Sequence, residues 1–569
     1  MPRMGTTGPN YQIGKSSLRE LNALAQVVLL GNFGGMVPKL DPRALPDGMA
    51  ALAYNCKLYA GTLQPFYGLK ALNTLGAPAS PVDFYDFVTS DGVEHYVGFA
   101  DVTDVVRAPL LNDAFDRLYF TNSSGPYITT RSNLAAGNVP AVALGVPAPA
   151  FTNLVVGTSG GTTAYETTRV YVATLVSQYG EESAPSAPVT VTGNDDGTWT
   201  VTGINTLIAP AAQYTTLQYL RLYRTVTTTQ GVNFYQVAQF ALNNLPTGVY
   251  TDGMASDVAA NQYQLPSLAW NTPPANLYGL VASPAGFLAA FVGRTVYFSE
   301  PYYPHAWPDA YQLAVEDDIV GLGLYGSTIV VLTKGRPYVI QGTQPGVMSL
   351  TKIDQPIPCL SRRGIVSMEG SVIFPTYDGL MAVSDSGLQL VTQSLLTKDQ
   401  WSAYSPSTLV ASQFEGRYYA FYNNANGFVF DPSNPSTSWM PLNIANVKQV
   451  RTSYVTGYLQ LLVGNTINQW DSDTTTLLPY YWKSGDYMTT APVNLGAAHV
   501  RADISSTQTL TMTMDADGVQ RFSYGITTDD QFRLPSGYKA KTYNIALSGT
   551  ATVYSVAAAP TGIDLRGVL

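Results

Sequence analysis

The clearest structural signal in this chain is the stretch Ile319-Val-Gly-Leu-Gly-Leu-Tyr-Gly326-Ser-Thr-Ile-Val-Val-Leu, followed by Lys334-Gly-Arg-Pro-Tyr-Val-Ile. Two apolar runs flank a glycine turn and a third run follows a second turn, which predicts antiparallel strands joined by hairpins. The form recurs at turn glycines spaced 33, 44, 46 and 41 residues apart by subtraction: Gly293, Gly326, Gly370, Gly416 and Gly457. A period of roughly 40 to 50 residues with about four strands per unit is typical of a β-propeller.

A diverged unit around Tyr85–Gly98 fits the beginning of the same ring. Two stacked meander sheets are the alternative, and the repeat period favours the propeller. Helical periodicity is nearly absent, with two short candidates, Ser17–Leu24 and Pro46–Asn55. The sequence therefore predicts an all-β chain.

Two further stretches have a different strand pattern, which predicts an inserted fibronectin-III/Ig-like β-sandwich and a C-terminal β-sandwich beside the propeller. The first contains Gly180-Glu-Glu-Ser-Ala-Pro-Ser and later Leu220-Arg-Leu-Tyr-Arg. The second contains Thr507-Gln-Thr-Leu-Thr-Met-Thr-Met, which alternates polar and apolar residues. The expected organisation is an N-terminal arm and assembly segment at 1–80, propeller at 81–145 and 263–478, the insertion at 146–262 and the C-terminal sandwich at 479–569.

The composition points toward assembly. Apolar residues make up 46% of the 569 residues, but charged residues only 12%, about half of the usual fraction of roughly 25%. The surface must instead be covered by uncharged polar groups and by many of the 38 tyrosines. Interface cores are poor in charge and rich in Tyr, so such a surface suits large permanent contacts.

The net charge of −9 and the lack of a basic block disfavour duplex binding, although a mildly acidic wall suits DNA that passes without sticking. Cys56 and Cys359 could pair, but two cysteines make no disulfide framework and no Cys/His metal spacing exists. The first 36 residues lack the regions of a signal peptide, so we expect synthesis in a cytoplasm without secretion.

Glycan-cleaving enzymes use paired carboxylates, so clusters of acidic residues are candidate catalytic groups. The densest cluster is Glu316-Asp-Asp318, and Asp101 with Asp104 is a second pair. Both lie beside expected strand ends, where Asp commonly caps turns, and capping is the favoured interpretation. Asn194-Asp-Asp-Gly197 and Asp471-Ser-Asp473 resemble calcium loops but complete none, so plain turns are expected.

The three histidines, His95, His305 and His499, have no second ligand at metal-binding spacing. For His305, within Pro304-His-Ala-Trp-Pro, packing against aromatic rings is the expected role. No Gly-x-Ser-x-Gly elbow, Walker loop or His-Glu-x-x-His is visible. We therefore expect no enzyme, no cofactor and no metal, and assign no catalytic, cofactor-binding or metal-ligating residue.

Three segments occur in a characteristic order: Asn32-Phe-Gly-Gly-Met-Val-Pro-Lys-Leu-Asp-Pro through Gly61-Thr-Leu-Gln-Pro, Gly335-Arg-Pro-Tyr-Val-Ile through Asp378-Gly-Leu, and Phe532-Arg-Leu-Pro-Ser-Gly-Tyr. Together they resemble the nozzle, or tail tubular B-type, proteins of podovirus-like phages. The specificity lies in their order, because no single motif is chemically diagnostic. The resemblance touches most of the chain and implies no catalytic residue.

The resemblance implies a virion structural protein: a homohexameric nozzle ring that closes a short tail and conducts DNA at ejection. Implied partners are the head-tail adaptor, tail fibres or spikes, the host envelope at the tail tip, and phage DNA in the lumen without sequence-specific binding. The Pro- and Gly-rich segment 31–48 is expected to run extended along another surface as an assembly contact, so that its deletion leaves the propeller folded. The alternative is a receptor- or glycan-binding tail protein, with or without polysaccharide-degrading activity.

Overall fold

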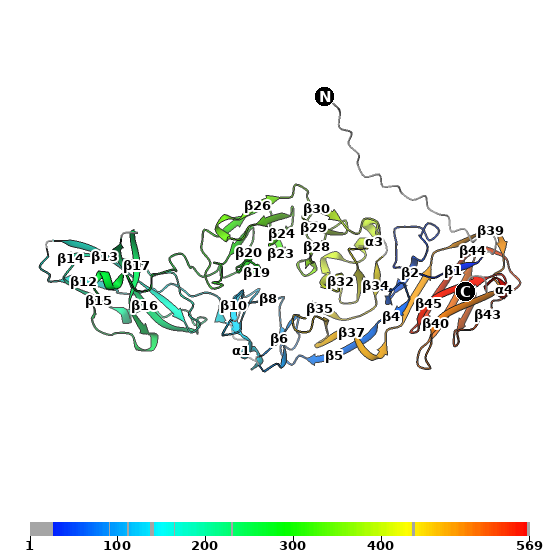
Figure 1. Cartoon of the computed structure of the whole chain (residues 1–569), viewed down its shortest axis with the longest axis horizontal. Coiled ribbons are helices and arrows are strands. Elements are labelled where there is room, and N and C mark those ends of the chain that lie inside the picture. The colour runs from blue at the N-terminus through cyan, green and yellow to red at the C-terminus, as the bar shows by residue number, and fades with distance from the viewer. Residues whose placement is uncertain are drawn as a thin grey trace, which may run out of the picture. The chain divides into compact units, whose positions relative to one another are not determined.

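The computed structural model describes residues 27–89, 91–110, 113–136, 142–163, 165–228, 231–434 and 438–565. These residues form small antiparallel sheets with only four short α-helices among them (Figure 1). The all-β fold is propeller-like, with an inserted and a C-terminal sandwich. The chain divides into two compact units, one containing Met1–Ser80 and Leu360–Leu569 and the other Pro81–Cys359.

Three four-stranded sheets of the propeller type lie in the first unit, and the first two are consecutive meanders. Their apolar strands are almost fully buried, as in Arg417–Tyr422 with its pattern of four buried residues. The first sheet has β27 (Val366–Ser367), β28 (Ser371–Pro375), β29 (Leu380–Ser384) and β30 (Gly387–Leu390). The second has β31 (Val410–Phe414), β32 (Arg417–Tyr422), β33 (Asn426–Phe430) and β34 (Met440–Leu442).

The third sheet is completed by a strand from the N-terminal part of the chain. It consists of β35 (Val447–Thr452), β36 (Leu459–Val463), β37 (Thr466–Leu477) and β5 (Tyr67–Thr74). Thr74 pairs with Thr466 and Lys70 with Gln469, so the edge of β37 is covered by backbone hydrogen bonds. Completion of a last sheet by the chain's early strand is how a propeller removes its open edge.

The C-terminal sandwich also recruits early strands. One sheet runs β2-β38-β44-β41-β42 with β39 also paired to β44, and the other runs β1-β45-β40-β43. The strands are β1 (Val28–Leu30), β2 (Ala50–Tyr54), β38 (Tyr480–Ser484), β39 (Tyr487–Val493), β40 (Ala497–Asp503), β41 (Leu510–Ala516), β42 (Val519–Gly525), β43 (Phe532–Arg533), β44 (Ala540–Gly549) and β45 (Thr552–Ala559). The expected alternation of the 507–514 stretch is present, since β41 buries every second residue.

Outside the inserted sandwich, the second unit holds a hairpin and three more four-stranded sheets. The hairpin is β6 (Asp83–Val88) with β7 (Glu94–Phe99), and the first sheet contains β8 (Asp104–Arg107), β9 (Arg117–Asn122), β10 (Gly125–Thr130) and β11 (Val142–Ala143). The others contain β19 (Tyr278–Ala282), β20 (Leu288–Val292), β21 (Thr295–Phe298) and β22 (Gln312–Ala314), then β23 (Ile319–Tyr325), β24 (Thr328–Thr333), β25 (Tyr338–Gln341) and β26 (Ser349–Lys352).

Between β11 and β19 the chain forms the inserted sandwich. A three-stranded sheet, β12 (Val155–Ser159), β15 (Thr198–Thr202) and β18 (Tyr250–Asp252), faces a four-stranded one. The latter contains β14 (Val189–Asn194), β13 (Glu166–Ser177), β16 (Leu217–Thr228) and β17 (Gly231–Ala241). Trp199 and Val201 of the first sheet share a buried core with Tyr171 and Leu222 of the second. The short helices are α1 (Arg131–Ala135), α2 (Ser256–Ala259), α3 (Lys398–Ser402) and α4 (Gly562–Leu565).

The glycine repeat is real, but its first member was misaligned. Gly326, Gly370, Gly416 and Gly457 lie between the first and second strands of their sheets, whereas Gly293 lies between the second and third. The residue equivalent to the later four is Gly286, between β19 and β20. Measured from Gly286, the spacings become 40, 44, 46 and 41 by subtraction. The misalignment explains why the first spacing was the shortest.

The helix expected at Pro46–Asn55 is wrong. A turn at Asp47–Gly48 leads into strand β2, which pairs with β38. Ala, Met and Leu favour helix intrinsically, but pairing and burial in a sheet outweigh so weak a preference. The other candidate, Ser17–Leu24, lies outside the described residues.

Candidate functional site

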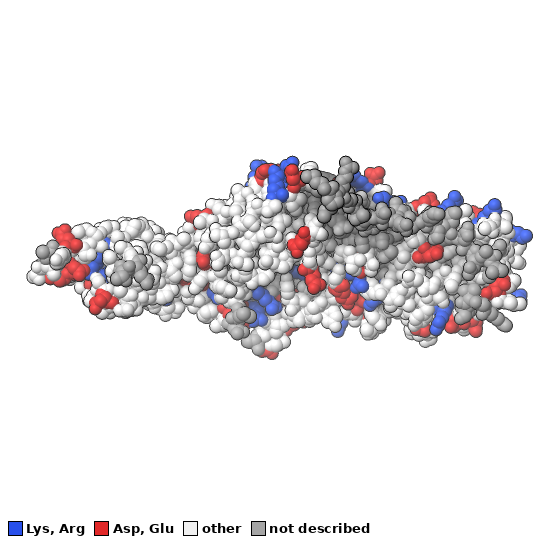
Figure 2. All heavy atoms as spheres, turned by 45° about the horizontal axis from the view of Figure 1, so that its top comes forward, with Lys and Arg blue, Asp and Glu red and all other residues white. Residues whose placement is uncertain are grey.

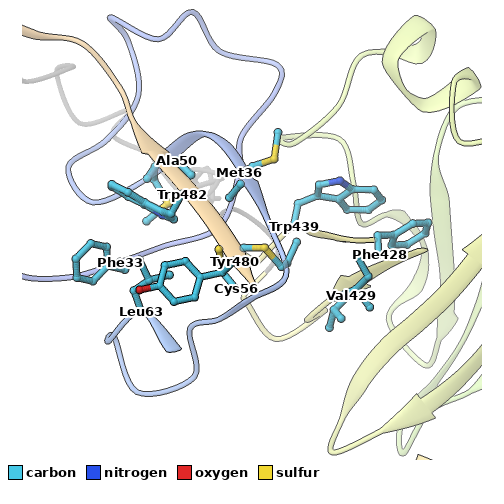
Figure 3. Close-up of a cluster of buried hydrophobic side chains, with 14 of the residues drawn as sticks. Phe33, Met36, Ala50, Cys56, Leu63, Phe428, Val429, Trp439, Tyr480 and Trp482 are labelled. Atoms are coloured by element: carbon cyan, nitrogen blue, oxygen red, sulfur yellow. The ribbon is translucent and has the colours of Figure 1, made fainter. Parts of the chain in front are cut away.

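The N-terminal segment is a structural part of the first unit (Figure 3). Phe33, Val37 and Leu45 are 2%, 5% and 3% exposed. Phe33 packs edge-on against Trp482 of β38, with ring centroids 5.0 Å apart. The expectation that this segment lies extended on another surface is therefore corrected: its apolar side chains are buried in its own chain, where leaving water stabilises them.

Backbone and indole hydrogen bonds fix the segment on both sides. The amide of Met36 donates to the carbonyl of Trp439, 2.8 Å away, and the indole Nε1 of Trp482 donates to Gly34 O at 3.0 Å. Trp439 in turn stacks on Phe428 of β33, with centroids 4.2 Å apart. The segment thus joins the β31–β34 sheet to the C-terminal sandwich, and Figure 3 shows these side chains converging from both.

A pocket of about 330 Å³ opens beside this joint. Its floor is apolar, formed by side chains of the N-terminal segment and of the β31–β34 sheet: Phe33, Met49, Cys56, Phe66, Val429 and Met440. Its rim is polar and includes Asn32, Tyr59, Arg417, Asp431, Asn434 and Ser438. An apolar floor with a few polar groups is the form of a binding pocket.

The rim groups are held by contacts with one another and with their neighbours. The Arg417 guanidinium lies 3.5 Å from the centre of the Tyr59 ring, and its Nη1 lies 3.1 Å from Oε2 of Glu415. The Tyr59 and Tyr419 hydroxyl oxygens are 2.6 Å apart, and burial raises the pKa of Tyr59 to about 12. Asp431 Oδ1 accepts the Ser433 amide at 2.9 Å. This arrangement can orient a bound group, but a tyrosine with that pKa does not act as a base near neutral pH.

Cys56 at the pocket floor is equally unreactive. It is 2% exposed, and its Sγ donates to the carbonyls of Tyr54 and Tyr481 at 3.3 Å and 3.1 Å. Burial raises the pKa of the thiol far above its usual value. Because the thiolate is the nucleophile, this cysteine is a packing residue. Cys359 is also buried, and the two cysteines form no disulfide with each other.

The acidic cluster Glu316-Asp-Asp318 forms ion pairs within the chain. Lys352 Nζ lies 2.6 Å from Oε2 of Glu316. Asp318 Oδ1 lies 3.0 Å from Arg294 Nε. Side-chain hydrogen bonds from these cations lower the pKa of both carboxyls. A general acid needs the opposite, a raised pKa, so the cluster does not resemble a glycosidase pair.

Three of the other acidic candidates accept backbone amide hydrogens. Asp101 accepts the amides of Val102 and Ser123, at 2.7 Å and 2.9 Å. Asp196 accepts the Thr162 amide at 2.8 Å, and hydrogen bonds from Thr162 and Thr163 lower its pKa. Asp473 accepts the amide of Thr475 at 3.0 Å. Across the described ranges, no group of three or more His, Cys, Asp or Glu could hold a metal ion.

The histidines lie apart in different elements. His305 is 3% exposed and meets the ring of Trp270 edge-on at 5.4 Å, as expected from its aromatic surroundings. Burial lowers its pKa to about 3. His95 stacks on Phe87 at 5.5 Å, and His499 Nε2 lies 3.2 Å from Asp529 Oδ1.

Sequence reasoning missed a set of buried ionic groups in the second unit. Arg117 of β9 binds Asp113 at 2.9 Å and Glu181 of the insertion at 2.8 Å, so the pair joins the sandwich to the β8–β11 sheet. Glu182 next to it binds Arg221 at 2.8 Å and accepts the Tyr223 hydroxyl at 2.6 Å. The only signal was two adjacent glutamates after Gly180, which does not reveal partners 39 to 64 residues away.

No family model and no curated protein matches the sequence. Solved structures similar to the chain include BBS1N in complex with ARL6DN, at 11% identity over 49% of this chain and 87% of that chain, with a TM-score of 0.25. BamB from Moraxella catarrhalis is similar at 11% identity over 57% and 95%, with a TM-score of 0.23. Myxococcus xanthus glutaminyl cyclase is similar at 14% identity over 34% and 89%, with a TM-score of 0.21. At these identities and scores the likenesses carry no argument about function.

Proposed function

We propose that this protein is a non-enzymatic structural component of a short phage tail. In the proposal it forms a hexameric nozzle ring that closes the tail tube and conducts DNA at ejection. Its contacts are other copies of itself, the head-tail adaptor above it, fibres or spikes, and the host envelope. The proposal starts from the resemblance of three segments to nozzle proteins and rests on one structural observation.

That observation is the structural role of the N-terminal stretch that resembles nozzle proteins. Residues 32–65 join the β31–β34 sheet to the C-terminal sandwich, with Trp482 and Trp439 as anchors, and together with that sheet they line the pocket. The residues of this stretch are used to pack two parts of the unit together. Such a use supports a mechanical role for the protein rather than a catalytic one.

The surface supports the same role. Figure 2 shows that most of the face it draws carries neither acidic nor basic side chains, which gather in small scattered groups. Several tyrosines are more than half exposed, among them Tyr454 at 76% and Tyr377 at 60%. Surfaces poor in charge and rich in Tyr suit permanent subunit contacts. None of the helices in the described ranges is long and apolar enough to cross a membrane.

The test is the mass of the purified full-length protein by light scattering, with electron microscopy of the protein alone and of virions. Rings of six below the head-tail connector are the expected result. A persistent monomer, or a trimer on peripheral fibres, overturns the proposal. Incubation with host polysaccharide is the second measurement, and shortened glycan chains would favour the degrading alternative instead.

A further inference from the structure

The loop between β21 and β22 carries two consecutive exposed tyrosines. It spans residues 299–311, and Tyr302 and Tyr303 are 58% and 44% exposed. Tyr302 has φ of +65°. This left-handed conformation is costly for a bulky residue other than glycine, and such strain gathers at functional positions. The second unit therefore maintains a strained backbone to present an aromatic ring to solvent.

The ring of Tyr302 rests on a glycine. The Tyr302 amide donates to the carbonyl of Gly286 at 2.7 Å. A Cβ at Gly286 would lie only 2.6 to 3.1 Å from three ring carbons of Tyr302. One part of the ring is therefore held against the β19–β20 turn while more than half of the side chain stays open, which makes a rigid aromatic surface.

The ring of Tyr303 is also held in place, in this case by packing against a tryptophan. Its ring lies 4.4 Å from that of Trp270, which is 8% exposed and covers His305. The amide of Tyr303 donates to Glu300 O, and its carbonyl accepts the Ala306 amide, both at 3.0 Å. A loop fixed by so many internal bonds holds its aromatic rings in place before any ligand arrives.

A third exposed tyrosine lies near this loop. Tyr263 is 52% exposed, with the Arg221 guanidinium 5.4 Å from its ring centre. Arg221 also binds Glu182 at 2.8 Å, and the amide of Ala184, two residues further along the chain, donates to the carbonyl of Trp270 at 3.0 Å, so Tyr263 lies near the Trp270–Tyr303 pair. The flanking residues Asn261, Gln262 and Gln264 are exposed. Amide side chains both donate and accept hydrogen bonds, as sugar hydroxyls require.

We propose that Tyr263, Tyr302 and Tyr303 form a binding platform for a neutral oligosaccharide. Flat aromatic faces accept the C–H faces of pyranose rings, and the surrounding amides match their hydroxyls. A nucleic acid fits poorly, because Arg221 is engaged by Glu182 and Gln239, and the loop itself adds the acidic Glu300 and Asp309. The site is independent of the hexamer proposal, since a ring could assemble with or without it.

The experiment is ligand-detected NMR and calorimetry on the full-length protein with maltohexaose, cellohexaose, laminarihexaose and a galactan hexasaccharide. Tyr302→Gly removes the ring and suits the left-handed backbone, so this variant should fold at least as well as the parent. Tyr303→Ala removes the second ring. Tyr454→Ala, at an exposed tyrosine in the first unit, is the matched control.

Binding of at least one hexasaccharide is expected, weakened roughly tenfold in each of the first two variants and unchanged in the control. No binding at millimolar sugar, or binding that both variants retain, overturns the proposal. Stronger binding of oligothymidylate than of any sugar would also overturn it and indicate base stacking. If the variants disrupt rings seen by microscopy while no sugar binds, the face is a subunit contact and the carbohydrate site is rejected.

Discussion

Arg224 and Asp252 form an ion pair inside the inserted sandwich, with Nε of the arginine 2.8 Å from Oδ2 of the aspartate and side chains 1% and 0% exposed. Asp252 also accepts the hydroxyl of Tyr171 at 2.7 Å. The pair links β16 of one sheet to β18 of the other, at the edge of the shared core.

Removal of one partner should be costly. Asp252→Asn leaves the arginine charge buried and is expected to lower the free energy of unfolding of the second unit by about 3 to 5 kcal/mol. Urea unfolding followed by hydrogen-exchange mass spectrometry measures each unit separately. The double variant Arg224→Met/Asp252→Leu should lose much less, because Arg169, which also faces Asp252, keeps its ion pair with Asp195. Equal losses in both variants would contradict this account, and Asp318→Asn at an exposed pair is the surface control.

His305 should make the second unit sensitive to acid. Its pKa is about 3 in the folded chain and about 6.5 when unfolded, so between these values only the unfolded chain binds the proton. The contribution of His305 to the free energy of unfolding is therefore fully present above pH 6.5. It is lost as the pH drops toward 3, by at most about 1.4 kcal/mol per pH unit. His305→Phe should flatten this dependence in unfolding measured from pH 7 to pH 4. An unchanged slope would show that other groups control it.

Phe33 should be essential to the first unit. Phe33→Ala removes a buried ring from the contact with Trp482 and is expected to cost about 3 to 5 kcal/mol in the free energy of unfolding. Leu40→Ala, at a residue 39% exposed in the same segment, should change it by less than about 0.5 kcal/mol. Hydrogen exchange in β2 and β38 measures the difference. Similar small effects for both variants would instead support the expectation that segment 31–48 is only an assembly contact with another molecule.

Both cysteines should be silent toward thiol reagents in the native protein. Cys56 and Cys359 are 2% and 4% exposed, and burial raises the pKa of Cys56. Dithionitrobenzoate should react with neither at neutral pH and with both after denaturation. Rapid native reaction of Cys56 would mean that the floor of the pocket opens on the time scale of the assay. The variant Cys56→Ser shows which of the two cysteines accounts for any reaction that is observed.

Repeats and alternation made much of the fold predictable. The glycine spacing revealed the four-stranded sheets, and the 507–514 alternation matched the burial of β41, because both signals are local. Pairing with residues hundreds of positions away has no such signal. The sequence therefore predicted an external arm at 31–48, although the Met36 amide donates a hydrogen bond to the carbonyl of Trp439 within the same unit.

The site was less predictable for the same reason. Turn capping was expected of the acids at 316–318 and 101. Asp101 does accept two backbone amides, whereas Glu316 and Asp318 form ion pairs with Lys352 and Arg294. The buried pairs of Arg117 and Arg224 could not be found, because nothing local distinguishes a buried arginine from an exposed one. The strained Tyr302 was equally hidden, since a positive φ at tyrosine contradicts every local preference.

The closure of the last sheet by β5 has a consequence for synthesis on the ribosome. The paired residues Thr74 and Thr466 are 392 positions apart, so β5 is translated long before β37 exists to receive it. Until β37 is made, the backbone hydrogen-bonding groups of β5 have no partner strand, so β5 can pair with other nascent chains. A circular permutant opened between Ser80 and Pro81 would place β37 before β5 in the order of translation, and should fold faster and aggregate less during expression.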